Sequence, residues 1–178
     1  MLTDDEMHAR MINGWRMGQP FTLCGNGSTL AATENVRRWL PEIVARYQIQ
    51  TVCDAGAGDM AWIAHVKWDV AYAPFDLIPR SAFVAALDIT RDRLPPCDLI
   101  LCRMVLNHLD RERIVMALAL FKQAGRYLAA TQFRAEDCID RARQFTRLDL
   151  RQYLGKPLEQ IQDGNEAGCR LALWKLGG

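Results

Sequence analysis

Residues 51–60 read TVCDAGAGDM, a short apolar strand followed directly by a glycine-rich turn. Gly56 and Gly58 allow a tight turn and let a ligand approach the backbone closely. A short helical stretch, Met60 to Val66, is predicted after the turn, and free N–H groups at its start favour a negatively charged group of a ligand. The segment therefore predicts a nucleotide-type ligand at the end of a buried strand.

Short apolar strands and helical patterns alternate after this turn. The predicted strands are Val70–Phe75, Phe83–Leu87, Leu99–Cys102 and Tyr127–Thr131, followed in the tail by Leu148–Leu150 and Cys169–Leu176. A helix between the fourth and fifth strands can be capped by Asp110 and ended by Gly125. This alternation indicates a parallel sheet covered on both faces, and the tail, without a helix between its strands, indicates an antiparallel pair. We therefore predict an α/β, Rossmann-like three-layer sandwich, mostly parallel, with a C-terminal antiparallel strand pair.

The chain of 178 residues has the length of one ordinary domain, and it shows no repeat and no linker. We predict a single domain over residues 1–178 with an N-terminal helical extension over about residues 1–47. Thr3–Glu6 fits a capping box for a first helix that ends at Asn13-Gly14. Apolar residues from Val36 to Tyr47 recur at helical spacing, and Pro41 is expected to start a new helical turn rather than lie in mid-helix.

The composition is that of an ordinary globular protein, with 50% hydrophobic residues and a net charge of +1. It lacks the basic excess of a dedicated nucleic-acid binder, although a local basic patch would fit a neutral total, so nucleic acid stays open as a partner. No run reaches the length of a membrane span, and no secretory signal opens the chain. The six cysteines are scattered without a C-x-x-C pair, which predicts reduced thiols and no metal site. We expect a cytoplasmic protein without a membrane partner.

Two acids lie where a nucleotide-type ligand needs them. Asp76 ends the second predicted strand, and its carboxylate can accept hydrogen bonds from both ribose hydroxyls. The pattern Gly56-x-Gly58-x-x-Ala61, with Asp76 about twenty residues on, also satisfies the NAD fingerprint. However, Asp54 stands where it can pair with a cationic amine, which S-adenosylmethionine (SAM) carries and NAD lacks. Asp54, the long helical N-terminus and the antiparallel tail favour SAM over NAD.

The chain resembles the class I SAM-dependent methyltransferases, especially short bacterial or phage-type members. Residues 51–59 are similar to their first motif, and residues 72–79 to the segment with the ribose acid. Residues 97–109 are similar to their fourth strand and its following turn, and residues 171–176 to the closing strand. The resemblance covers most of residues 28–176. It implies an enzyme that moves the sulfonium methyl of SAM to an acceptor by in-line displacement.

The resemblance also implies which residues surround the cofactor. They are Asp54, Ala55, Gly56 and Gly58 for its amino-acid part, Asp76 for the ribose, Leu77, Asp88 and Ile89 for the adenine, and Cys102 and Arg103 for the methyl end. One departure is Met60, which stands where many members have a third glycine. Asp59 is expected to cap the helical stretch after the turn. Residues 25–29 are expected to form either a lid over the cofactor or a plain connector.

The methyl acceptor is not named by any motif. The D/N-P-P-Y/F turn of amino-directed DNA methyltransferases is replaced by Arg103-Met104-Val105-Leu106, and Pro96-Cys97 lies before the fourth strand rather than after it. A small molecule, a nucleic acid and a peptide therefore all stay open. Because the sulfonium already activates the methyl group, a base is needed only if the acceptor must lose a proton. His108, Asn107 and Arg103 are the candidates, each with a purely structural alternative.

Two further hypotheses concern function and assembly. A non-catalytic domain that binds SAM or a nucleotide, as a scaffold or regulator, is compatible with the same fold. The link from Leu77 to Ala82 is too short for a helical crossover and contains Pro79, so we predict an extended return. Part of one sheet face would then lack cover. Either the N-terminal segment around Trp15 and Phe21 covers it, or a second copy does so in a two-fold homodimer.

Overall fold

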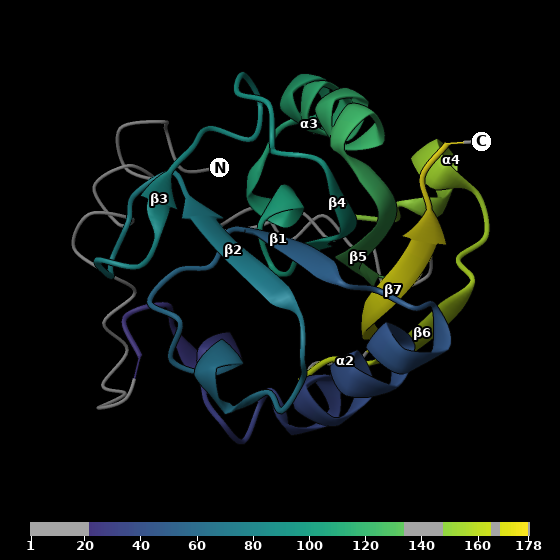
Figure 1. Ribbon diagram of the computed structural model, residues 1–178. Helices are drawn as coiled ribbons and strands as arrows, with labels where there is room; N and C mark the ends of the chain where they lie inside the picture. The colour runs from purple at the N-terminus through teal and green to yellow at the C-terminus, as the bar shows by residue number, and fades with distance from the viewer. Residues whose placement is uncertain (1–21, 134–147, 165–167, 178) are drawn as a thin grey trace.

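The computed structural model of the chain describes residues 22–133, 148–164 and 168–177. These residues form one seven-stranded sheet in the order β3-β2-β1-β4-β5-β7-β6, with helices on both faces (Figure 1). The predicted first helix, Trp15, Phe21 and the arginine-rich residues 134–147 lie outside the described residues. The described helices include none with the length and apolar character needed to cross a membrane.

The sheet is parallel from β3 to β5 and reverses at β7. Its strands are β1 (Thr51–Ala55), β2 (Ala71–Asp76), β3 (Ala85–Ala86), β4 (Cys97–Cys102), β5 (Gly125–Phe133), β6 (Glu159–Gln162) and β7 (Cys169–Lys175). The strand β7 pairs antiparallel with both β5 and β6. The predicted Rossmann-like sheet with an antiparallel pair at its C-terminal end is therefore confirmed.

The predicted partner of the last strand was wrong. Residues 148–150 are not a strand, and a one-turn helix, α4 (Arg151–Leu154), follows them. Leu148 and Leu150 are buried in the core, so their apolar character reflects packing rather than strand pairing. The true partner, β6, reads EQIQ and has no fully buried residue, because it is the edge strand of the sheet. A mostly polar edge strand does not produce the apolar run that predicts a buried one.

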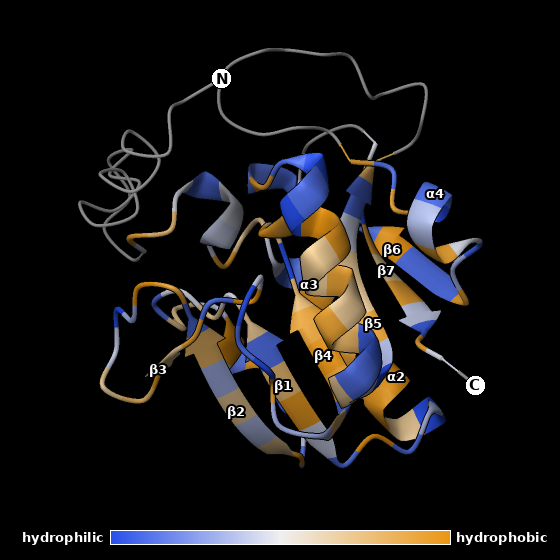
Figure 2. Cartoon of the chain, turned by 90° about the horizontal axis from the view of Figure 1, so that it is seen from above, coloured by the Kyte–Doolittle hydropathy of each residue, from blue (hydrophilic) through white to orange (hydrophobic). Residues whose placement is uncertain are grey.

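Two long helices cover the two faces of the sheet (Figure 1). The helix α2 (Glu34–Arg46) buries an apolar stripe against one face, and α3 (Arg111–Ala124) packs on the other, where the central strand β4 is strongly apolar (Figure 2). The Asp110 carboxylate accepts from the Arg113 N–H at 2.8 Å and Gly125 ends α3, so both predicted caps are confirmed.

The expectation for Pro41 was wrong, because Pro41 lies inside α2. Val36, Trp39, Leu40 and Ile43 are buried on both sides of it along the helix. Their burial outweighs the one backbone hydrogen bond that a proline removes.

The link between β2 and β3 contains no helix, as predicted. The strand β3 begins later than expected and has two residues, both exposed. The helical stretch predicted over Met60–Val66 is also shorter, with a single 3₁₀ turn, η2 (Ile63–His65). Leu77 and Phe83 in and near the link are 48% and 81% exposed, so apolar surface does lie open beside β3 within the described part of the chain.

Candidate functional site

The candidate site lies where the carboxyl ends of the parallel strands meet. After β1 the chain builds β2 and β3 on one side, and then places β4 and β5 on the other. In open α/β sheets, ligands bind at such a switch point, outside the carboxyl ends of the strands. The turn that follows β1 is the predicted glycine turn, and Ala55, fully buried, is the last strand residue before it.

The glycine turn has a backbone that requires glycine. Gly56 and Gly58 have φ angles of 116° and 59°, which residues with a side chain rarely adopt. A Cβ atom on Gly56 would lie 2.1 Å from Cγ2 of Val105, which follows β4. The N–H groups of Gly56 and Ala57 donate to the Phe75 carbonyl at 2.8 and 2.9 Å. The turn is therefore held between β2 and the loop after β4.

Asp76 lies beside this turn, as the sequence predicted. Its Oδ2 accepts a hydrogen bond from the Gly58 N–H at 2.9 Å, and its Oδ1 accepts from the Ile78 N–H at 3.0 Å. Each carboxylate oxygen has two lone pairs, so Asp76 keeps the capacity to accept from a ligand hydroxyl as well. The acid at the end of β2 thus also shapes the glycine turn.

Asp54 is a buried acid, with 3% of its surface exposed. The Tyr72 hydroxyl, from β2, donates to its Oδ2 at 2.5 Å. Burial raises the pKa of Asp54 to about 7, and the nearby Asp76 charge adds to the rise. The hydrogen bond from Tyr72 and the positive charge of Arg103 lower the pKa, but they offset only part of this effect. Tyr72 was not among the predicted site residues. The sequence feature that could have indicated it is a hydroxyl group within a strand that was expected to be buried.

Arg103 is a buried cation that ties three segments together. Its Nε and NH2 groups donate to Oδ1 of Asp163 at 3.0 and 2.8 Å, and NH2 also donates to the Gly27 carbonyl at 2.7 Å. Its guanidinium lies over the Trp62 ring, 5.2 Å from the centroid. Arg103 therefore holds η1 (Asn26–Ser28) and the end of β6 in place. These contacts give Arg103 a structural role, which was the alternative to its candidate catalytic role. Asp163 was missed.

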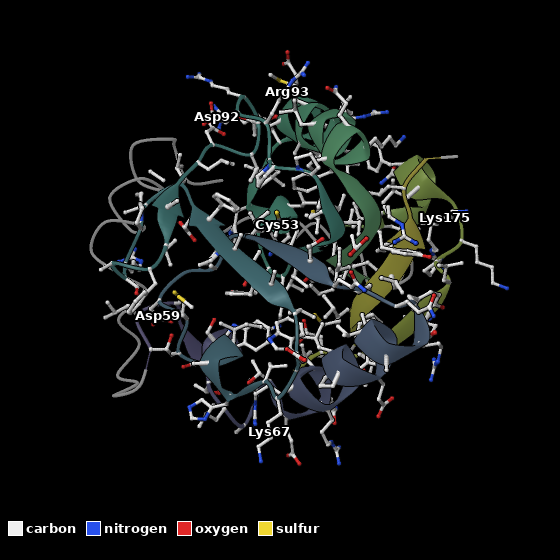
Figure 3. The ribbon with its side chains drawn as sticks, in the orientation of Figure 1. Cys53, Asp59, Lys67, Asp92, Arg93 and Lys175 are labelled. Carbon is white, nitrogen blue, oxygen red and sulfur yellow. The ribbon has the colours of Figure 1, made fainter. Side chains whose placement is uncertain are left out.

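Asp59, labelled in Figure 3, follows the second glycine of the turn. Its side chain connects this turn to the beginning of the described chain. Its Oδ1 accepts from the Ala61 N–H at 3.1 Å within the turn. The predicted capping role was wrong, because the helical turn that follows, η2, begins at Ile63 with Trp62 at its N-cap and has no side-chain cap. Its Oδ2 accepts from the Thr22 hydroxyl at 2.8 Å and from the Leu23 N–H at 2.6 Å. The segment before η1 is thus attached to the turn that follows β1.

Cys24 lies directly over this turn. A Cβ atom on Gly58 would come within 2.6 Å of the Cys24 Sγ. Burial and the nearby Asp59 charge raise the pKa of Cys24 to about 11, so the thiol stays protonated. Together with the Gly27 contact of Arg103, this contact holds the segment against the glycine turn, an arrangement that either predicted role, a lid or a plain connector, would have.

The residues expected around the adenine lie at neighbouring strand ends. Leu77 follows β2 and is half exposed, while Ile89 follows β3 and is buried. The two ends are joined by a hydrogen bond from the Leu87 N–H to the Asp76 carbonyl at 2.9 Å. Asp88 accepts from the backbone and hydroxyl of Thr90 at 2.9 and 2.7 Å. The fold therefore brings the predicted adenine residues together, and Asp88 caps its own turn.

The carboxyl end of β4 holds the remaining candidates. Cys102 is fully buried, and burial raises the pKa of its thiol above the usual range. Asn107 and the half-buried His108 lie in the turn η3 (Leu106–His108). Asn107 is 1% exposed, and neither Oδ1 nor Nδ2 of its amide has a hydrogen-bond partner among the described residues. Among the candidate catalytic residues, Asn107 thus has a side-chain amide that can still hydrogen-bond to a ligand.

Comparison with known proteins identifies the fold. No protein-family model matches the sequence, and no curated protein matches it either. Among solved structures, the N-methyltransferase NodS from Bradyrhizobium japonicum WM9, in complex with S-adenosyl-L-homocysteine (SAH), is similar over 98% of both chains, with 15% identity and a TM-score of 0.65. The fold is that of the SAM-dependent methyltransferases.

Two further structures have this methyltransferase fold. The magnesium protoporphyrin IX methyltransferase ChlM from Synechocystis PCC 6803, with bound SAM, is similar over 99% of both chains, with 15% identity and a TM-score of 0.64. The 1,6-didemethyltoxoflavin N1-methyltransferase of Burkholderia thailandensis matches 83% of this chain and 80% of its own, with 16% identity and a TM-score of 0.63. The likeness in fold therefore extends over nearly the whole chain at low sequence identity.

Proposed function

We propose that this chain is a SAM-dependent methyltransferase that moves the sulfonium methyl to an acceptor by in-line displacement. One observation carries the proposal: within a methyltransferase fold, a buried acid, Asp54, precedes a tight glycine turn that Asp76 helps to shape. The same arrangement supports SAM as the cofactor.

The residues at the turn fit the amino-acid part of SAM. Asp54 accepts one hydrogen bond, on Oδ2, and its Oδ1 has no partner in the ranges that the structure describes. A buried carboxylate is stable when a cation lies beside it, and the ammonium group of SAM would be that cation. Bound SAM supplies a methyl group already activated by the sulfonium. The protein then has to bind SAM and the acceptor, orient them and exclude water. The segment that Arg103 and Asp59 hold is placed to exclude water.

NAD fits this chain less well than SAM. Bound NAD would leave Asp54 as a buried acid beside a ligand that has no ammonium group. In addition, β7 runs antiparallel between β5 and β6, whereas the dinucleotide fold has the order 3-2-1-4-5-6.

We place the acceptor at the carboxyl ends of β4 and β5. Asn107 lies on this side, and its amide has both a donor and an acceptor without a partner in the described chain. The Burkholderia thailandensis enzyme was solved with bound 1,6-didemethyltoxoflavin, and this supports a small-molecule acceptor ahead of a peptide or nucleic acid. His108 is the candidate base for an acceptor that must lose a proton. We also propose a cytoplasmic location, which the free, mostly buried thiols support.

Calorimetry with SAM, SAH and NAD tests the ligand. We expect SAM and SAH to bind and NAD not to bind, and clear NAD binding without a response to SAM would contradict the proposal. Catalysis is tested by SAH formation from SAM with a panel of small polar acceptors, with Asp54→Asn as the matched variant. Tight SAM binding without SAH formation from any acceptor would instead favour the non-catalytic scaffold.

A further inference from the structure

Tyr72 lies in β2, outside the set of residues assigned to the cofactor. It pairs with Val52 in the register of β1 and β2, so its side chain lies on the same face of the sheet as that of Asp54, two residues after Val52. Its ring contacts that of Trp68, with centroids 5.8 Å apart. Its hydroxyl donates to Asp54 Oδ2 at 2.5 Å. The ring is therefore held by packing while the hydroxyl reaches a buried acid.

The direction of this hydrogen bond is well defined. Burial and the charge of Asp54 raise the pKa of Tyr72, so the phenol keeps its proton and acts as the donor. The bond occupies Oδ2 and orients the carboxyl group. It leaves Oδ1 as the oxygen without a partner among the described residues.

We infer that Tyr72 is a positioning residue, which holds the Asp54 carboxylate so that Oδ1 receives the ammonium group of the bound cofactor. The inference rests on the proposed function, because it assigns a role to a residue behind the amine-binding acid. Tyr72 does not contact the cofactor in this role. It acts through Asp54 by orienting the carboxylate and by stabilising its charged form.

The role has a consequence for pH dependence. The titratable and charged groups around Asp54 are Tyr72, Asp76 at the end of β2, Arg103 and Cys102 at the end of β4, and Cys53 on β1. The pKa of Asp54 is about 7, so the ammonium group must displace a proton when it binds at lower pH. Removal of the Tyr72 hydroxyl removes an interaction that lowers this pKa, and it should move the pH dependence of binding upward.

The test uses calorimetry with two ligands from about pH 8 to about pH 6, a range that spans the titration of Asp54. SAH carries the ammonium group, whereas 5′-methylthioadenosine keeps the adenosine and sulfur but lacks it. The variant is Tyr72→Phe. The matched control is Tyr47→Phe, which also removes a hydroxyl–carboxylate hydrogen bond, to Glu159 Oε1 at 2.7 Å, but on β6 at the edge of the sheet.

We expect Tyr72→Phe to weaken SAH binding about tenfold or more near pH 7, the scale of a hydrogen bond to a charged group. The pH at which SAH binding is half lost should rise in this variant, whereas its affinity for 5′-methylthioadenosine should change little. The Tyr47→Phe control should bind both ligands as the unmodified chain does. Equal losses for both ligands, or an unchanged SAH affinity and pH profile, would overturn the inference.

A second measurement needs no variant. The unmodified chain should release a fraction of a proton on binding SAH near pH 7 and none on binding 5′-methylthioadenosine, measured in buffers with different ionisation enthalpies. The absence of proton release with SAH would overturn the inference even if Tyr72→Phe did not fold. A chain that binds neither SAH nor SAM would instead refute the proposed function, and the role of Tyr72 with it.

Discussion

Replacing Arg103 by leucine should destabilise the protein strongly. The side chains of Arg103 and Asp163 are 5% and 1% exposed, so the variant would leave the Asp163 charge buried without its partner. Breaking a buried ion pair in this way costs about 3–5 kcal/mol. Arg103 also donates to the Gly27 carbonyl and lies over Trp62, a cation–π contact that contributes roughly another 0.5–2 kcal/mol. We therefore expect the free energy of unfolding to fall by about 4–7 kcal/mol, a large part of the total for a domain.

The assay is urea denaturation followed by tryptophan fluorescence and circular dichroism. The matched variant is the double substitution of Arg103→Leu with Asp163→Leu, which removes both charges. It should recover most of the loss, because replacing a buried pair by apolar residues is often neutral. A loss below about 1 kcal/mol for Arg103→Leu, the range of exposed pairs, would refute the reasoning. A double variant that is less stable than the single one would do so as well.

Three further predictions concern the site and the assembly. Asp76→Ala should weaken SAH binding by roughly 1.5–3 kcal/mol, measured by calorimetry, and an unchanged affinity would mean that the ribose lies elsewhere. The pKa of Asp54 is raised from 3.8 to about 7 on folding, so its burial costs nothing below the unfolded value and progressively more as the pH rises to 7. The free energy of unfolding of Asp54→Asn, relative to the unmodified chain, should therefore rise by roughly 3–4 kcal/mol from about pH 4 to about pH 8, and a difference that stays constant with pH would contradict this. If a second copy covers the open face, Phe83→Asp should convert a dimer into a monomer in light scattering, whereas a concentration-independent monomer before substitution would leave coverage by the chain itself.

Local chemistry explains which parts of the fold could be predicted from the sequence. The glycine turn, the Asp110 cap and the Gly125 stop each depend on neighbours within a few residues, and the structure has all three. The missed edge strand β6 is mostly polar, and Pro41 lies in a helix that tertiary packing stabilises. In both cases contacts with distant residues overrode the local pattern.

The site was predictable only in part for the same reason. Asp54, Gly56, Gly58 and Asp76 belong to one strand–turn–strand unit, and the fold brings them together. The pairs Tyr72–Asp54 and Arg103–Asp163 join separate elements, the second across 60 residues of sequence. A hydrogen bond between distant residues leaves no periodic signal in the chain, so its partners had to come from the structure.

The ends of the sheet bear on how copies of this protein meet. At one edge, β3 has two residues, and at the other, β6 has four, with Pro157 shortly before it. Such short outer strands present few unpaired N–H and C=O groups, so they are poor templates for a strand from another molecule. The chain therefore resists edge-to-edge aggregation at both ends of its sheet. A homodimer formed on the open apolar surface around Leu77 and Phe83 would rest on side-chain contacts and would keep two separate sheets rather than one continuous one.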